Sequence, residues 1–198
     1  MASMVTHAVG AALSIFALIL MVVRAEGALG VTSAAIFGVS LTLLYLSSTL
    51  YHIFTGTRVK AFFQLMDHAC IYVLIAGTYT PVSLLALGGV WGWSLFGVVW
   101  GLAVAGIVFK SITHGRNDHW ISTALYVAMG WLVVIAGKPL VEAVEKGGLV
   151  LLVAGGVCYS LGVIFFVWER LRFNHAVWHV FVMAGSACHV AAVVGWVI

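Results

Sequence analysis

The stretch NHAVWHVFVMAGSACHV, residues 174–190, decides the fold class, because it is apolar enough for a lipid bilayer and yet carries three histidines. It opens an apolar run that extends to residue 197. The hydrocarbon core of a bilayer is about 30 Å thick and needs about 20 apolar residues for each helical crossing. The run therefore predicts a membrane-spanning helix that contains His175, His179 and His189.

The composition of the whole chain favours the same environment. Of its 198 residues 64% are apolar and 8% are charged, and the mean hydropathy is +1.17. A chain with so few polar residues cannot surround a core with a water-soluble surface. Further continuous apolar runs, without the alternation typical of β-barrel strands, cover residues 4–24, 31–54, 67–87, 91–110, 119–137 and 147–168. We therefore predict an all-α, polytopic membrane protein with seven transmembrane helices.

The segments between these runs are short and carry turn or charge signals. Connections of this length are typical of neighbouring antiparallel helices. We therefore expect one seven-helix domain over residues 1–198, integral to the cell membrane, whether plasma membrane or bacterial inner membrane, as a multi-pass protein.

The distribution of Lys and Arg predicts the orientation of the bundle. The second, fourth and sixth connections hold six of these residues: Arg58, Lys60, Lys110, Arg116, Arg170 and Arg172. The first, third and fifth hold only Arg24, Lys138 and Lys146. Because basic residues favour the cytoplasmic side, we expect a cytoplasmic N-terminus and an external C-terminus. This bias also explains the net charge of +3, so no nucleic-acid partner is needed.

This topology brings four ionisable residues to one level. His52 lies in the last turn of the second predicted helix, Asp67 opens the third, and His175 and His179 occupy the first two turns of the seventh. A spacing of four residues places His175 and His179 on one side of a helix. This spacing suits two ligands of one metal ion, and His52 could supply a third nitrogen, leaving a fourth position for water.

Each of these residues also has an ordinary structural interpretation. A lone histidine near a helix end is usually an interfacial residue, and Asp67 could be the N-cap of its helix. Apart from Glu169, however, Asp67 is the only acidic residue at this level. Ionisable groups in membrane segments are costly and mostly face the bundle interior, and this favours a functional cluster.

Two further patterns concern helix faces. Polar residues in the second helix recur every three or four positions, which predicts a stripe facing the bundle interior: Thr42, Tyr45, Ser48, Thr49 and His52. The sequence GVVWG at 97–101, extended by Ala105, offers small residues and predicts close helix packing.

Three motifs together resemble a known family. They are SSTLYH (47–52), which contains Ser48 and His52; MDHACIYVLIAGTYTP (66–81), which contains Asp67; and NHAVWHVFVMAGSACH (174–189). In this order, over essentially the whole chain, they resemble the hemolysin III branch of the progestin and adipoQ receptor (PAQR) superfamily, whose wider relatives include alkaline ceramidases. The resemblance implies that His52, His175 and His179 bind Zn²⁺, with Asp67 and Ser48 beside the metal and its water. Only six residues precede His7, so the long cytoplasmic region of the receptor members is not matched, which argues against receptor signalling.

The other intramembrane histidines receive different predictions. His189 lies ten residues beyond His179, about 15 Å deeper by helix rise, and we expect a hydrogen-bonded core residue there. His7 is either a partner of a metal ligand or a wet interfacial residue.

Three functions fit these observations. The first is a zinc-dependent hydrolase of a lipid amide or ester, in which Asp67 takes a proton from water and Ser48 orients Asp67 or donates to the developing oxyanion. The second is a membrane regulator or receptor with a structural zinc and a bound lipid. The third is a pore or transporter, which ranks last because the outer halves of most predicted helices are almost purely apolar.

Overall fold

The computed structural model describes residues 2–113 and 119–198, and this part of the chain is helical without any strand. The α-helices are α1 (Ala2–Arg24), α2 (Gly27–Ile53), α3 (Thr57–Pro81), α4 (Gly89–Thr113), α5 (His119–Gly130), α6 (Gly137–Ala143), α7 (Lys146–Val167) and α8 (Asn174–Trp196). A π-helical segment, Val82–Leu87, continues α3, and a 3₁₀ segment, Leu132–Ala136, joins α5 to α6.

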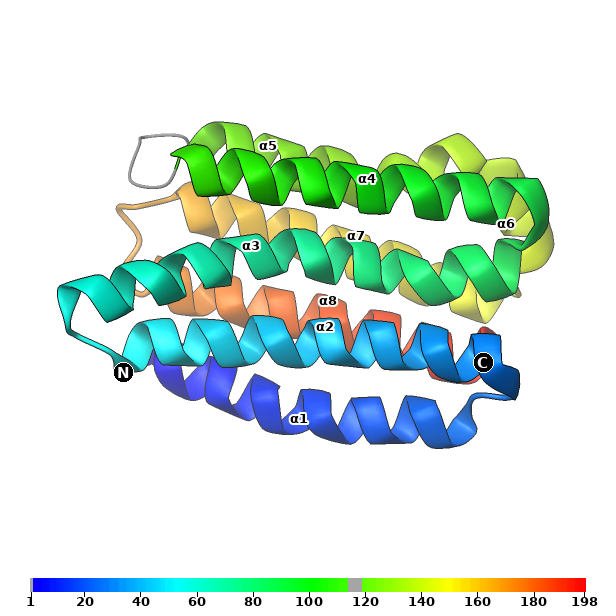
Figure 1. Cartoon of the computed structure of the whole chain (residues 1–198), viewed down its shortest axis with the longest axis horizontal. Coiled ribbons are helices and arrows are strands. Elements are labelled where there is room, and N and C mark those ends of the chain that lie inside the picture. The colour runs from blue at the N-terminus through cyan, green and yellow to red at the C-terminus, as the bar shows by residue number, and fades with distance from the viewer. Residues whose placement is uncertain (1, 114–118) are drawn as a thin grey trace.

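Seven spans in this part of the chain are long and apolar enough to cross a membrane, as predicted. Five are single helices, whereas α3 with its π-helical segment forms the span Thr57–Leu87 and α5 to α6 form the span Trp120–Ala143. Figure 1 shows the helices side by side, with the two ends of the chain at opposite ends of the bundle.

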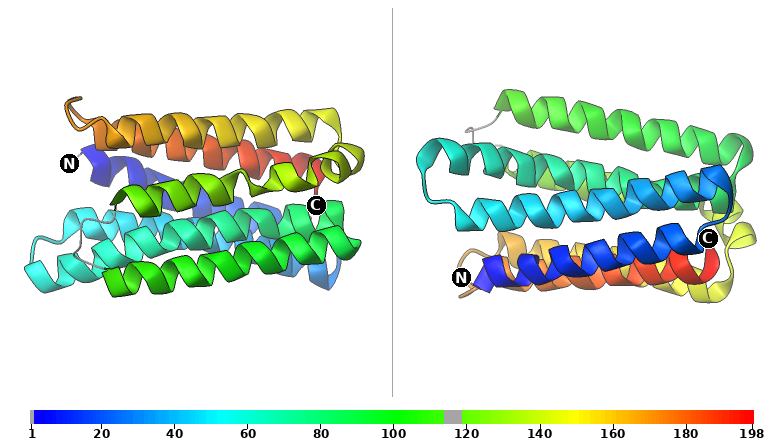
Figure 2. Two further views of the ribbon diagram at one scale, coloured as in Figure 1. Left: turned by 90° about the horizontal axis from the view of Figure 1, so that it is seen from above. Right: turned by 60° about the horizontal axis from the view of Figure 1, so that its bottom comes forward.

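Helix α3 packs on α2, α4 and α5 and contributes to two core clusters. One cluster joins α3 to α1, α2 and α8 through large side chains such as Met21 and Phe37. The other joins α3 to α4 and α5 around Tyr72. The most extensive pairings are α7 with α8, α1 with α2, and α2 with α3, and α1 also packs on α8. The first helix therefore contacts both α2 and α8, as the two views of Figure 2 show.

Two boundaries differ from the prediction. The third helix begins at Thr57, ten residues before its apolar run, so Asp67 lies inside the helix and its prediction as an opening or N-cap residue is wrong. The polar residues Arg58, Lys60 and Gln64 are good helix formers, so the helix continues beyond the hydrophobic stretch. The short helix α6 lies in an expected connection, with Pro139 in its first turn, where proline is tolerated.

The sequence predicts that Gly97 and Gly101 allow close helix packing, and within the described chain this prediction is wrong. A Cβ atom added at either position would meet nothing within 4 Å, because this face of α4 points away from the bundle. The close approaches of α4 occur at Gly106, which lies against the ring of Tyr72, and at Gly92, which lies against the carbonyl oxygen of Ser83.

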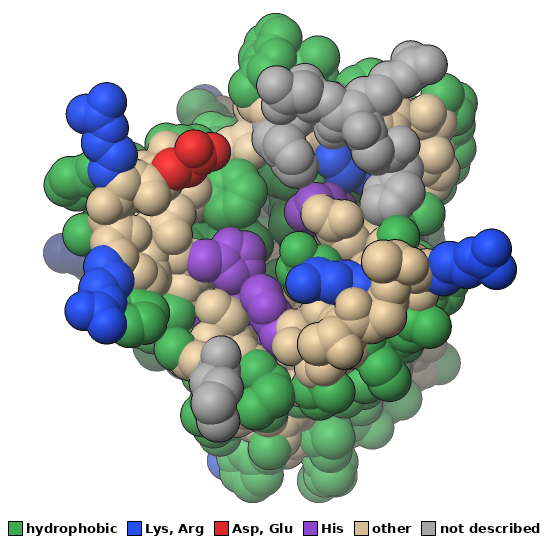
Figure 3. All heavy atoms as spheres, turned by 90° about the vertical axis from the view of Figure 1, so that its left-hand side faces the viewer, with side chains coloured by type: hydrophobic (Ala, Val, Ile, Leu, Met, Phe, Trp, Pro, Cys, Tyr) green, Lys and Arg blue, Asp and Glu red, His purple; other side chains and the backbone are tan. Residues whose placement is uncertain are grey.

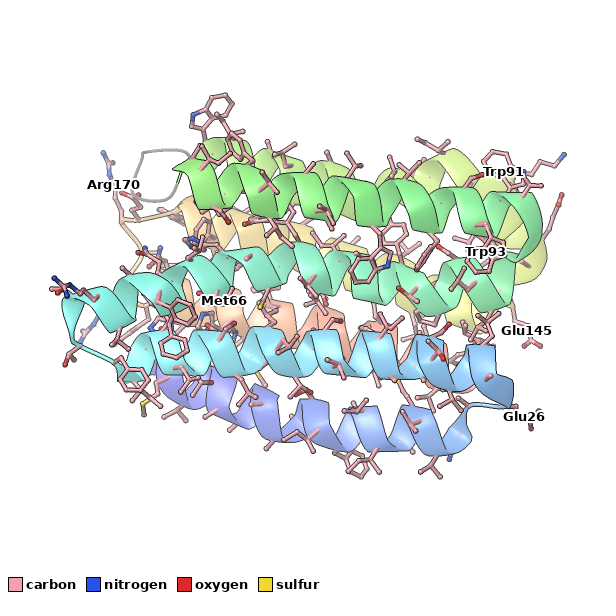
Figure 4. The ribbon with its side chains drawn as sticks, viewed as in Figure 1. Glu26, Met66, Trp91, Trp93, Glu145 and Arg170 are labelled. Carbon is pink, nitrogen blue, oxygen red and sulfur yellow. The ribbon has the colours of Figure 1, made fainter. Side chains whose placement is uncertain are left out.

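We call the end of the bundle where α2 ends and α8 begins the histidine end. Figure 4 shows Arg170 at this end and Glu26 and Glu145 at the other. Of the six basic residues predicted to be cytoplasmic, Arg116 lies outside the described residues, and the other five belong to segments at the histidine end. That this end is cytoplasmic stays a prediction.

Candidate metal centre

Three histidines from two helices converge at the histidine end, and we call them the histidine trio. His52 lies in the last turn of α2, and His175 and His179 lie in the first two turns of α8. One potential ligand atom from each residue lies within 4.8 Å of the other two. The ring centroids of His175 and His179 are 4.5 Å apart, and that of His52 lies 5.1 and 5.3 Å from them. The sequence prediction that these residues share one site is thus met in space.

The nitrogen atoms of the trio fit a metal ion. In all three rings Nε2 is buried and has no hydrogen-bond partner in the described chain. Imidazole nitrogens bind zinc at about 2.0–2.1 Å, which places ligands of a tetrahedral ion roughly 3.4 Å apart. The candidate ligand atoms of the trio lie within 4.8 Å of one another. Shifts of about 1 Å in the positions of the rings would bring them to the spacing of zinc ligands. The donor set is therefore one that could hold a metal ion.

Residues of α1 hold the ring of His179 in place. His179 Nδ1 lies 3.1 Å from both Thr6 Oγ1 and the carbonyl oxygen of Ser3. The Thr6 hydroxyl already donates to Ser3 O at 2.9 Å, so its oxygen is free to accept. Both contacts therefore assign the proton to Nδ1 and leave the lone pair on Nε2. Partners of this kind fix the tautomer and orientation of metal-binding histidines.

His7 packs directly on this ring. Its side chain is 1% exposed, and its ring stacks on that of His179 with centroids 3.4 Å apart and planes 13° from parallel. The edge of the Tyr45 ring contacts His7 at 5.1 Å. The alternative that His7 is a wet interfacial residue is therefore wrong, and His7 belongs to the surroundings of the trio.

A glycine allows α1 to come this close to α2. Gly10, one turn after His7, lies on the ring of Tyr45, where an added Cβ would be 2.7 Å from Cδ1. The Tyr45 hydroxyl donates to Ser186 Oγ at 2.8 Å, and Tyr159 also shares this serine at 2.9 Å. These bonds link α2, α7 and α8 just below the trio and fix the surface on which α1 packs.

Asp67 and Ser48 lie in the interior, as the polar stripe of α2 predicts. Their side chains are 2% and 0% exposed, and Tyr45 and Thr49 are buried as well. The Asp67 carboxyl group is close enough to interact with the Ser48 hydroxyl, although Ser48 Oγ makes no hydrogen bond of standard geometry. The structure thus brings a carboxyl group and a hydroxyl together, whereas their catalytic roles stay predictions.

His189 lies apart from the trio, as its sequence position predicts. Its Nε2 is 3.1 Å from the carbonyl oxygen of Leu152, which can only accept, so this nitrogen carries the proton. Its ring also contacts that of Tyr159 at 5.4 Å. The prediction of a hydrogen-bonded core histidine is confirmed.

A cavity of about 150 Å³ lies in the bundle next to His7, whose ring stacks on that of His179; the three histidines of the trio do not line it themselves. His7 lines it, together with residues of α3, α5, α7 and α8 that are mostly apolar. On α3 the lining runs from His68 to Tyr79, a length of about 16 Å by helix rise. Figure 3 views the histidine end, where histidine side chains gather near the centre of the face and Lys and Arg side chains lie mostly at its rim.

The sequence prediction missed the contribution of α1 through Ser3 and Thr6. A signal was present, because Ser3, His7, Gly10 and Ser14 recur every three or four residues and so share one helix face. This face packs against α2 and α8.

Comparison with known proteins gives a consistent result. A family model described as "Haemolysin-III related" matches residues 1–190. The chain is 47% identical to "Hemolysin-3" of Bacillus cereus over 189 residues, covering 94% of this chain and 86% of that protein. It is 45% identical to the "Hemolysin-3 homolog" of Bacillus subtilis (strain 168), with coverage of 94% and 88%. A more distant relative is the human "Monocyte to macrophage differentiation factor", 27% identical over 81% of this chain and 68% of that protein.

Proposed function

The chain belongs to the haemolysin III family of membrane proteins, and we propose that it is a zinc-dependent hydrolase that cleaves a lipid amide or ester bond beside the histidine trio. The observation that carries this proposal is the convergence of three buried, unpartnered Nε2 atoms, next to His7, which lines a mostly apolar cavity and stacks on His179. Zinc is the expected ion because three imidazoles with room for a fourth ligand are typical of catalytic zinc sites.

The side chains near the trio have the properties that hydrolysis requires. When bound, zinc supplies Lewis-acid activation of a water molecule and of an acyl carbonyl. Asp67 accepts the proton of the attacking water at a carboxylate oxygen and returns it to the leaving amine or alcohol. Ser48 has an unused hydroxyl hydrogen, which orients the Asp67 carboxylate or donates to the developing oxyanion.

The cavity favours a lipid as substrate. Its lining includes aliphatic and aromatic side chains such as Leu74, Val182 and Trp178, and its lining residue His7 stacks on His179 of the trio. An apolar chain is the kind of group that this lining can bind, and a polar group next to His7 would then lie beside His179.

The test uses purified, zinc-loaded protein and a panel of lipid amides and esters, with released fatty acid measured by mass spectrometry. We expect the wild type to release fatty acid and Asp67→Asn to lose this activity while retaining zinc, since Asp67 is not among the metal-ligand candidates. Zinc retention by a wild type that releases no fatty acid from any lipid would exclude the hydrolase.

One observation supports a second function, a membrane regulator with a structural metal. The trio joins α2 to α8, two helices whose main packing partners are α1, α3 and α7 and not one another. A metal ion shared by them would clamp the bundle at the histidine end. This function predicts that zinc removal lowers the melting temperature and that no lipid is cleaved.

A further inference from the structure

His7 has hydrogen-bonding capacity that no protein group in the described chain uses. Both of its ring nitrogens are buried, and neither has a hydrogen-bond partner. A neutral imidazole carries one N–H donor and one acceptor lone pair. Burying such groups unpaired is unfavourable, so a ligand group that pairs with His7 would gain stabilisation there.

The neighbours of His7 contact its ring without using its nitrogens. Tyr45 packs against the ring, and its hydroxyl is engaged with Ser186. His179 offers only its ring face, because the two rings are stacked. The nitrogens of His7 therefore lie in a plane nearly parallel to the ring of His179 and displaced from it.

His7 is also distinct from the candidate metal ligands. The group of mutually close ligand atoms contains His52, His175 and His179, and His7 does not join it in the described structure. A role in binding the metal is thus left to the trio, and the nitrogens of His7 are not used by any group in the described chain.

That molecule can reach His7 through the cavity. His7 is the residue of α1 that lines it, and its neighbours on the cavity wall include Leu44, Trp178 and Val182. An acyl chain in this mostly apolar space has its carbonyl group near His7 when that end of the chain lies at the α1 wall of the cavity. The carbonyl oxygen of an acyl group accepts hydrogen bonds and matches a ring N–H.

We propose that His7 donates a ring N–H hydrogen bond to the carbonyl oxygen of a long-chain acyl lipid and so holds that carbonyl beside the histidine trio. This inference rests on the proposed function for the identity of the ligand, but it concerns binding and does not require turnover. The proposed ligand is a lipid with a carbonyl group directly at the end of its apolar chain. A hydrocarbon has no carbonyl oxygen and could not accept this hydrogen bond.

The experiment uses 2-nonadecanone, a long-chain ketone that has the carbonyl but no bond to hydrolyse. Zinc-loaded protein in maltoside micelles is titrated with the ketone, and binding and the infrared carbonyl stretch are measured. In the wild type we expect bound ketone with its stretch lowered in frequency by a hydrogen bond. His7→Phe keeps the stacked ring and removes both nitrogens, so we expect about tenfold weaker binding and no lowered stretch.

Two further measurements separate ligand binding from structural effects. His7→Phe should keep its zinc and its elution on size-exclusion chromatography, and His7→Asn or His7→Gln should restore the lowered stretch, because each amide retains an N–H near one ring nitrogen. Unchanged ketone binding by His7→Phe, loss of its zinc, or no ketone binding by the wild type would each overturn the inference. A wild type that binds the ketone through His7 but hydrolyses no lipid would refute the proposed hydrolase and leave this inference standing.

Discussion

Replacing Thr6 by valine tests whether α1 controls the candidate metal centre. Valine has the shape of threonine but no hydroxyl, so Thr6→Val removes one of the two acceptors that face His179 Nδ1 at 3.1 Å. The other acceptor, the carbonyl oxygen of Ser3, also lies at 3.1 Å and loses its bond from the Thr6 hydroxyl. Ser3 O still accepts the helical backbone bond from His7 N–H, but it no longer receives the Thr6 hydroxyl, so it keeps the proton on His179 Nδ1 and the loss is partial.

The expected loss of zinc affinity is limited because two acceptors share the N–H group of His179 Nδ1. Removing a partner of a metal-binding histidine costs about 10–100-fold in metal affinity. Because one acceptor remains, we expect the lower limit, a zinc dissociation constant raised about tenfold, equivalent to about 1.4 kcal/mol. Thr78→Val is the matched control, since the Thr78 hydroxyl bonds only to Leu74 O within α3 and lies far from the trio.

The assay is competition for zinc between purified protein and a chromophoric chelator, with melting temperatures to check folding. An affinity of Thr6→Val within twofold of the Thr78→Val value would refute the role assigned to α1. Complete loss of zinc by a folded Thr6→Val protein would also refute it, because a shared hydrogen bond cannot account for so large an effect.

The remaining predictions concern the trio, the helix contact and the orientation. His179→Ala should abolish tight zinc binding in a metal-content assay, whereas His189→Ala should leave it unchanged, because His189 bonds to a backbone carbonyl elsewhere; equal effects would contradict the trio. Gly10→Ala should destabilise the protein by about 1–3 kcal/mol in thermal or denaturant unfolding, since its Cβ would overlap the Tyr45 ring; Gly97→Ala, with open space around it, is the control and should be nearly neutral. A reporter at the C-terminus should be external and one in the α4–α5 connection cytoplasmic, and reversed labelling would overturn the predicted orientation.

The sequence was sufficient to predict the seven spans and the histidine trio. Long apolar runs have few structural solutions in a bilayer, and the turn-by-turn spacing of His175 and His179 does not depend on how α8 packs. The position of His52 at the same level followed from the alternation of helix direction. Helix ends were less predictable, because the bilayer limits only the apolar part. The polar residues at the start of α3 extend the helix beyond its apolar run, so Asp67 lies inside the helix and not at its start.

The contribution of α1 could not be predicted with the same certainty. Helix spacing shows that Ser3, His7 and Gly10 share a face, but it does not say which helices that face meets. The contact with His179 depends on the packing of α1 against both α2 and α8. Likewise, Gly97 and Gly101 form a pattern that favours packing, and only the arrangement of α4 reveals that this face points outward.

The candidate metal centre joins one helix that is synthesised early, α2, to the helix that is synthesised last, α8. His52 enters the membrane with the second span, and His175 and His179 follow only with the seventh. Until α8 has inserted, the nascent bundle holds one nitrogen of the trio, and Thr6 has no ring to orient. If the trio binds a metal ion, its three ligands are together only after α8 has inserted. On the proposed metal site, metal content would then report whether a chain has completed its insertion, since a chain that stops before α8 lacks two of the three candidate ligands.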